Sequence, residues 1–161
     1  NLHSFSISKG TWPEAEPTIM KDPKFAYWYA KDVIKGRWPE AEPTIMSEQA
    51  YLYSKYVIKG RWPEAEPHMM KDPELACLYA KYVIVGRWPE AEPTIMSDPY
   101  FAYSYASHII KGRWPEAEPT IMSDPVWACR YAMDIIRGRW PEAEPAIMKN
   151  PEIWAKYELF Q

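Results

Sequence analysis

The segment from Asp98 to Met122, DPYFAYSYASHIIKGRWPEAEPTIM, decides the fold of this chain. Its first two residues are typical of a helix start, because aspartate caps free N–H groups and proline needs no N–H in the first turn. Apolar residues then recur on one face of a helix of ~13 residues. Gly112 is expected to end this helix in the left-handed conformation, as glycine commonly does. The residues of the apolar face are Ala102, Tyr105, Ala106, Ile109 and Ile110.

A shorter helix is predicted after the turn that contains Trp114. Proline inside a helix removes a backbone hydrogen bond, which leaves two alternatives for its start. Either the helix begins at Pro115 with a 3₁₀-like first turn, or it begins nearer to Pro119. The Asp-Pro pair at Asp124 should stop it, because the residue before a proline avoids the helical region.

The phrase GRWPEAEP repeats this segment along the whole chain. With one variant, GTWPEAEP, it recurs at intervals of 26, 24, 26, 26 and 26 residues. One such helix pair cannot bury its apolar side alone, so stacked pairs must share a core. We therefore predict an all-α fold, an α-solenoid of about six helix-turn-helix repeats with one long and one short helix each. Residues 1–161 are expected to form a single tandem-repeat domain, with phrases that start at Gly10, Gly36, Gly60, Gly86, Gly112 and Gly138.

The tryptophans of the phrase are expected to form the structural core, because each carries a large apolar area. The second repeat lacks the Asp-Pro pair, and Ser47 is expected to replace the missing cap. In the last repeat Trp154 and Glu158 stand where other long helices have alanine, which suits a helix that no further repeat covers. The predicted core tryptophans are Trp12, Trp38, Trp62, Trp88, Trp114 and Trp140.

Composition excludes several classes of protein. A net charge of −3 argues against a dedicated binder of nucleic acid or anionic membranes. The chain has no apolar run long enough to cross a membrane. Cys77 and Cys129 occupy one repeat position two repeats apart, ~20 Å at the usual spacing of packed helices. A disulfide needs Cα atoms within about 7 Å. We therefore predict free thiols and a cytoplasmic location.

The pattern DPxxAxxYAxxVIxGRWPEAEP, read from Asp72 to Pro93, resembles tandem-repeat proteins encoded by tailed bacteriophages. The resemblance covers nearly the whole chain, with departures at Thr11, His68 and Ala146. It implies a phage-encoded protein acting in the cytoplasm of a bacterial host, and it implies no activity for any residue. In architecture the chain is also similar to tetratricopeptide and Sel1-type repeats, whose periods are longer.

Positions that vary between repeats on the exposed face of the long helices are candidates for partner contact. In the first half of the chain they are apolar or aromatic, and an exposed apolar patch usually marks an interface. The alternative is that these side chains are scattered surface residues or become covered. The position of Phe25 is nearly always large and apolar, so we expect it to pack between repeats. The predicted partner-binding residues are Trp28, Leu52, Tyr56, Leu78 and Tyr82.

Two charged patterns have simple structural explanations. Lys31, Lys55 and Lys81 line one face, which we interpret as a solvated surface, with a nucleic-acid-binding array as the alternative. The paired glutamates of the phrase recur in near-identical copies, whereas catalysis needs one asymmetric site. They are expected to stabilise helix N-termini and to pair with arginines such as Arg87 of a neighbouring repeat.

No catalytic, cofactor or metal site is predicted. His3, His68 and His108 lack the spacing of metal ligands, and no nucleophile–histidine pattern or glycine-rich phosphate loop is present. The sequence therefore predicts a non-enzymatic scaffold that mediates protein–protein interaction. Two alternatives stay open, a self-associating component of a filament or virion, and a nucleic-acid-binding repeat array.

Overall fold

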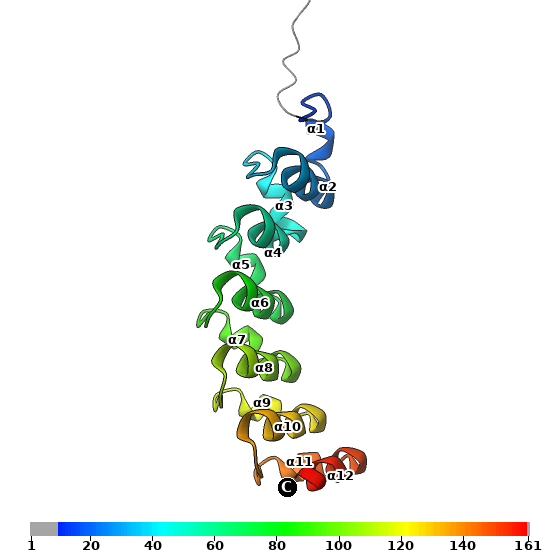
Figure 1. Cartoon of the computed structure of the whole chain (residues 1–161), viewed down its shortest axis with the longest axis vertical. Coiled ribbons are helices and arrows are strands. Elements are labelled where there is room, and N and C mark those ends of the chain that lie inside the picture. Colours follow the sequence, from blue (N-terminus) through cyan, green and yellow to red (C-terminus); the bar gives the residue numbers. More distant parts are fainter. Residues whose placement is uncertain (1–9, 161) are drawn as a thin grey trace, which may run out of the picture. The chain divides into compact units, whose positions relative to one another are not determined.

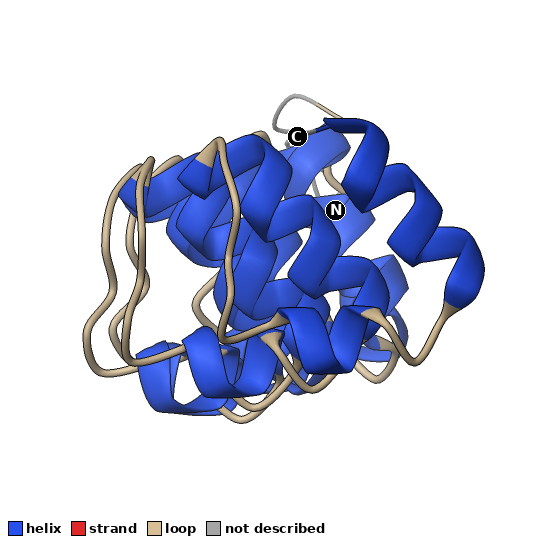
Figure 2. Cartoon of the chain, turned by 90° about the horizontal axis from the view of Figure 1, so that it is seen from below, coloured by secondary structure: helices blue, strands red, loops and turns tan. Residues whose placement is uncertain are grey.

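The computed structural model describes residues 10–160, and every regular element in them is a helix. Figure 2 shows helices joined by loops, with no strand in this part of the chain. Long and short helices alternate along the sequence, as the repeated phrase predicts. The predicted all-α fold, an α-solenoid built from helix-turn-helix repeats, is therefore confirmed.

The chain forms two compact units that divide between Met69 and Met70. That residues 1–161 act as a single domain stays a prediction. Each unit contains short helices that start at the second glutamate of the phrase. In the first unit they are α1 (Glu16–Ile19), α3 (Glu42–Glu48) and α5 (Glu66–Met69). In the second unit they are α7 (Glu92–Ile95), α9 (Glu118–Ile121) and α11 (Glu144–Ile147).

The long helices begin as α-helix, and all but the last close with a π-helical turn, labelled η. In the first unit they are α2 (Pro23–Tyr29) with η1 (Ala30–Ile34), and α4 (Ala50–Tyr53) with η2 (Ser54–Ile58). In the second unit they are α6 (Pro73–Tyr79) with η3 (Ala80–Ile84), α8 (Pro99–Tyr105) with η4 (Ala106–Ile110), α10 (Pro125–Tyr131) with η5 (Ala132–Ile136), and α12 (Pro151–Phe160).

The Asp-Pro pairs start long helices as predicted. Asp98 Oδ1 accepts hydrogen bonds from the backbone N–H groups of Tyr100 and Phe101, at 2.9 and 3.1 Å. These N–H groups have no partner within the helix, so the carboxylate stabilises its first turn. The same cap is made by Asp22, Asp72, Asp124 and, in the last repeat, Asn150.

The prediction that Gly112 takes the left-handed conformation is wrong. The left-handed residue is Lys111, with φ 58°, directly before the glycine. The N–H groups of Lys111 and Gly112 both donate to the carbonyl of Ala106, at 2.8 and 3.3 Å. This wider last turn reverses the chain one residue before the glycine. The equivalent left-handed residues are Lys35, Lys59, Val85 and Arg137.

The short helix starts near its second proline, the second of the two predicted alternatives. The N–H groups of Ala117 and Glu118 donate to the carbonyl of Trp114, at 3.0 and 3.2 Å, and form a turn. The helix α9 then begins at Glu118 with Pro119 in its first turn. Helix N–H groups have no partner there, so Pro119 removes no hydrogen bond.

The prediction that Ser47 caps a long helix is also wrong. Ser47 lies inside α3, where its hydroxyl donates to the carbonyl of Thr44 at 2.8 Å. The helix α4 follows Gln49, whose side chain makes no capping hydrogen bond. Because this repeat has no Asp-Pro pair, nothing stops the short helix at its usual end, and it continues to Glu48.

The core lies where long helices pack on each other and on the short helices between them. In the second unit α6, α8, α10 and α12 lie side by side (Figure 1). Ala102 and Ala106 are fully buried on the contact face of their long helix, and their small side chains let neighbouring backbones approach. The fully buried tyrosine Tyr105 fills the space beside them.

Five of the six predicted core tryptophans are buried, and the ring of each of these five lies against the ring of the tyrosine nine residues earlier. For Tyr105 and Trp114 the ring centroids are 5.0 Å apart. The prediction for Trp12 is wrong, because 64% of this residue is exposed. No long helix precedes Trp12 within the described residues, so no tyrosine ring covers its indole. The buried tryptophans are Trp38, Trp62, Trp88, Trp114 and Trp140.

Candidate interaction surface

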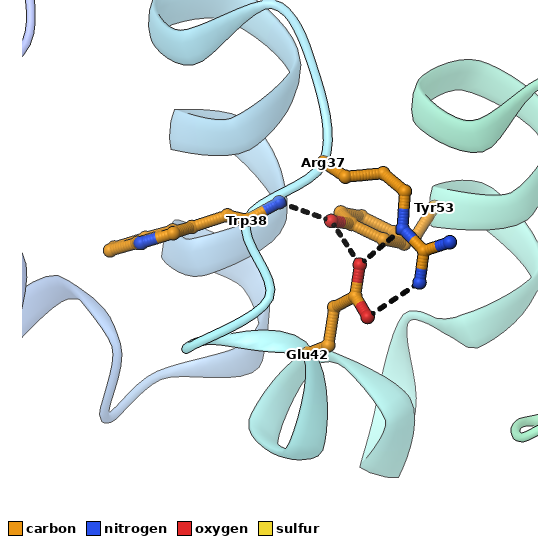
Figure 3. A network of polar contacts seen from close by, with 4 residues as sticks. All are labelled: Arg37, Trp38, Glu42 and Tyr53. Carbon is orange, nitrogen blue, oxygen red and sulfur yellow. Dashed lines mark hydrogen bonds and ion pairs between the residues drawn. The ribbon is translucent and has the colours of Figure 1, made fainter.

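A polar network of four residues joins the phrase that begins at Gly36 to the long helix that follows it (Figure 3). The Arg37 guanidinium donates from Nε and Nη2 to the two carboxylate oxygens of Glu42, both at 2.8 Å. The hydroxyl of Tyr53 donates to Glu42 Oε1 at 3.0 Å and accepts the backbone N–H of Trp38 at 2.7 Å. No buried side-chain nitrogen or oxygen among the described residues lacks a hydrogen-bond partner.

The network recurs with the repeat. The tyrosine follows the tryptophan by 17 residues in the second unit, and by 15 residues for Trp38, where the chain is two residues shorter. The deletion therefore removes linking residues and keeps the contacts. In the second unit the networks are Arg87–Glu92–Tyr105–Trp88, Arg113–Glu118–Tyr131–Trp114 and Arg139–Glu144–Tyr157–Trp140.

The electrostatics of the network suit a structural role. Hydrogen bonds from Arg37 hold the pKa of Glu42 below its usual value, and Arg87 does the same for Glu92. Burial raises the pKa of Tyr53 to about 12. At neutral pH the glutamate is therefore ionised and the tyrosine is protonated, so neither group is poised to exchange a proton.

The prediction that Arg87 forms an ion pair with a glutamate of a neighbouring repeat is wrong. Arg87 and Glu92 belong to one phrase, 2.8 Å apart. The bend of the phrase brings these two side chains together. On a straight helix, residues five positions apart would not be expected to pair. Glu116 of the next phrase acts on Arg87 only through longer-range attraction. The role of the tyrosine was missed, although its constant spacing from the tryptophan is a signal in the sequence.

The predicted partner-binding residues of the first unit include two strongly exposed aromatic side chains. Trp28 is 52% exposed and Tyr56 is 45% exposed. Lys31 Nζ lies 4.6 Å from the ring centroid of Trp28 and 5.9 Å from that of Tyr56, so the lysine joins the two rings. Leu52 is only half-buried and contributes less surface. We name Trp28, Lys31, Lys55 and Tyr56 the aromatic–lysine surface.

Lysines dominate the charge around this surface. Lys55 Nζ lies 5.1 Å from the ring centroid of Tyr56, and its pKa is raised chiefly by its hydrogen bond with Tyr51. The long-helix segments 23–35 and 50–59 contain five lysines and one aspartate, a net charge of +4. A groove of about 200 Å³ beside Tyr56 is lined by Lys31, Lys35 and Lys59. This face of the first unit is therefore both aromatic and basic.

The other two predicted partner-binding residues belong to the second unit. Tyr82 is exposed, and Lys81 Nζ lies 5.3 Å from its ring centroid. Leu78 is half-buried.

The expectation that the position of Phe25 packs between repeats holds for Trp127, whose ring lies against Tyr100 and Tyr103 of the preceding long helix. Phe25 itself is exposed, and the described residues provide no earlier long helix to cover it.

The described residues hold no cluster of three histidine, cysteine, aspartate or glutamate side chains that could bind a metal ion. His68 and His108 belong to different elements, and His3 lies outside the described residues. Cys77 and Cys129 are buried free thiols, as predicted, and burial raises the pKa of each. Within residues 10–160 no helix has the length and apolar character needed to cross a bilayer.

The resemblance to phage repeat proteins stays a prediction. No protein-family model, no curated protein and no solved structure matches this chain.

Proposed function

We propose that this chain is a non-enzymatic helical-repeat scaffold that binds an acidic protein partner through the aromatic–lysine surface of its first unit. The observation that carries this proposal is the exposure of Trp28 and Tyr56 with Lys31 between their rings. Tryptophan and tyrosine are the residues most enriched at the energetic centres of protein interfaces. The surrounding lysines favour a partner with acidic side chains and would speed its association.

The repeated network supports the non-enzymatic part of the proposal. Its ionisable groups, such as Arg37, Glu42 and Tyr53, satisfy one another and recur in near-identical copies. A catalytic centre needs a group free to act on substrate.

The test compares the full chain with the double variant Trp28→Ser, Tyr56→Ser as bait in an extract of the native host. The matched control is Val85→Ser, Met148→Ser, which removes exposed apolar side chains from the second unit. Each captured protein is then purified, and its Kd is measured for all three baits. We expect the double variant to bind at least about tenfold more weakly than the control. Equal Kd values for the two variants would overturn the proposal.

Binding of single-stranded nucleic acid is the second candidate, because lysines interleaved with exposed aromatic rings also suit stacked bases and phosphates. Against it, Lys31 already lies over the ring of Trp28, where a base would stack. The net charge of −3 also opposes a polyanion. A mobility-shift titration with single-stranded DNA and RNA at low and high salt decides between them, since phosphate binding must weaken steeply with salt.

End-to-end self-association has less support. Tyr105 and Tyr131 each pack against a tryptophan of the following phrase, whereas the ring of Tyr157 lies 5.4 Å from Trp154 of its own helix. An indole therefore already lies against the ring of Tyr157. We expect a concentration-independent mass by analytical ultracentrifugation, and growth of the mass with concentration would favour self-association instead.

A further inference from the structure

A groove of about 550 Å³ lies between the last two long helices of the second unit, α10–η5 and α12. This volume is in the range of protein sites that enclose a ligand, about 300–1,000 Å³. Its floor contains the buried thiol of Cys129, and Leu159 and Phe160 form an exposed apolar edge. The apolar lining consists of Val126, Cys129, Met133, Ile153, Leu159 and Phe160.

The preceding repeat interface shows what fills the equivalent space. Between α8 and α10 the ring of Trp127 lies 4.8 Å from that of Tyr100 and is stacked on Tyr103 at 5.4 Å. Three aromatic side chains therefore close this interface.

At the last interface the three positions that lie 26 residues later hold smaller side chains. Tyr100 is replaced by Val126, Tyr103 by Cys129 and Trp127 by Ile153. The loss of these three rings therefore leaves room for the groove at this junction. A space that holds an indole in one repeat is suited in shape to an indole or phenol ring in the next.

The polar residues at the groove are mainly basic. Arg130 and Lys156 lie at its edge with Asp134. The carboxylate of Asp134 accepts the hydroxyl of Tyr103 at 2.7 Å and keeps its charge, so these three groups together carry a net charge of +1. In the preceding interface Arg130 lies 5.8 Å from the ring centroid of Trp127, and Lys156 is its equivalent one repeat later.

We propose that this groove binds an aromatic side chain of a partner polypeptide, with acidic residues beside that side chain contacting Arg130 and Lys156. Burial of the ring against Val126 and Ile153 supplies the apolar contact, and the two cations select acidic flanking residues. The site lies in the second unit and does not depend on the aromatic–lysine surface of the first.

The first test uses the acetylated and amidated tripeptide Glu-Trp-Glu, titrated into the full chain by calorimetry. We expect a Kd below about 1 mM for the unmodified chain and at least a tenfold weaker Kd for Ile153→Trp. That variant restores the large ring of the preceding repeat and fills the groove from within. The matched control is Phe101→Trp, the same repeat position between α6 and α8, which leaves the groove open and should bind normally.

The second test measures whether the bound peptide protects Cys129 from alkylation. In a Cys77→Ser background, the rate at which iodoacetamide alkylates Cys129 should fall at least threefold when the tripeptide is saturating. A further variant, Lys156→Glu, should weaken Glu-Trp-Glu more than Gln-Trp-Gln. Circular dichroism and thermal melting establish that each variant is folded, and Val126→Tyr replaces Ile153→Trp if the latter is not.

Three results would overturn the proposal. The first is no binding of the tripeptide to the unmodified chain. The second is equal binding by a folded groove-filling variant. The third is binding of free indole-3-carboxylate with no binding of the peptide, which would assign the groove to a small molecule.

Discussion

The hydroxyl of Tyr131 accepts the backbone N–H of Trp114 at 2.6 Å, although the two residues are 17 positions apart. The same hydroxyl donates to Glu118 at 3.0 Å, and Glu118 is paired with Arg113. One tyrosine thus connects a long helix to the turn and to the short helix of the preceding phrase. Since the contact recurs in other repeats, it defines how one helix pair is positioned on the next.

The first prediction concerns this hydroxyl. Tyr131→Phe keeps the buried ring but leaves the N–H of Trp114 without its acceptor. We expect a loss of about 1–3 kcal/mol in the free energy of unfolding, measured with urea. Tyr103→Phe is the control, because its hydroxyl bonds to Asp134 at an exposed site and its loss should cost less than about 1 kcal/mol. Equal effects of the two variants would contradict the importance of the network.

The second prediction is alkaline unfolding. Burial raises the pKa of Tyr53 and Tyr131 from 10.0 to about 12. Between these values the unfolded chain loses the tyrosine protons and the folded chain keeps them, so stability is present below pH 10 and falls as pH rises toward 12. Each tyrosine should contribute a loss on the order of 2–3 kcal/mol. Urea unfolding from pH 9 to 12 measures it, and Tyr131→Phe should have a shallower decline.

The third prediction is loss of stability in acid. The hydrogen bonds from Arg87 lower the pKa of Glu92 from its ordinary value of 4.5. The folded chain therefore binds this proton less readily than the unfolded chain. Its contribution is present above pH 4.5 and is lost as pH falls through the lowered pKa. Glu92→Gln should cost roughly 1–2 kcal/mol at pH 7 and flatten the pH dependence of thermal unfolding below 4.5. If the loss of stability below pH 4.5 is the same in this variant as in the unmodified chain, other carboxylates control that loss.

The fourth prediction concerns Val85, which has a left-handed φ of 57° although it is β-branched. Such a conformation is strained for valine and free of strain for glycine. The side chain is 77% exposed, so removing it loses little packing. Val85→Gly should therefore raise the free energy of unfolding by about 1 kcal/mol. Val85→Ala should give a smaller gain, and a lower melting temperature for Val85→Gly would contradict the prediction.

Local signals in the sequence predicted the helices well. The pair Asp98 and Pro99 defines the start of a long helix because both act on N–H groups only a few residues away. Signals that depend on the exact path of the backbone were less reliable. Gly112 was expected to be left-handed, but the helix ends with a π-helical turn and the left-handed residue is Lys111.

Of the two candidate sites, the sequence predicts one and does not predict the other. The exposure of Trp28 and Tyr56 follows from helical periodicity, which places them opposite the buried alanines. The groove beside Cys129 does not follow from periodicity. It requires knowledge that Tyr100, Tyr103 and Trp127 meet in space, although they come from two helices.

The sequence by itself determined the repeat, the Asp-Pro starts of the long helices and which face of each long helix is buried, because those properties depend on residues within one or two turns. Only the tertiary structure decided which distant side chains meet: Tyr131 with Trp114, Tyr103 with Trp127, and Lys31 with Tyr56. It also decided that Trp12 is exposed, since a tryptophan is buried here only where a tyrosine of an earlier long helix lies against it. The burial of a side chain and its polar partners in another repeat depend on which residues lie next to it in space. The sequence of one phrase alone does not specify those neighbours.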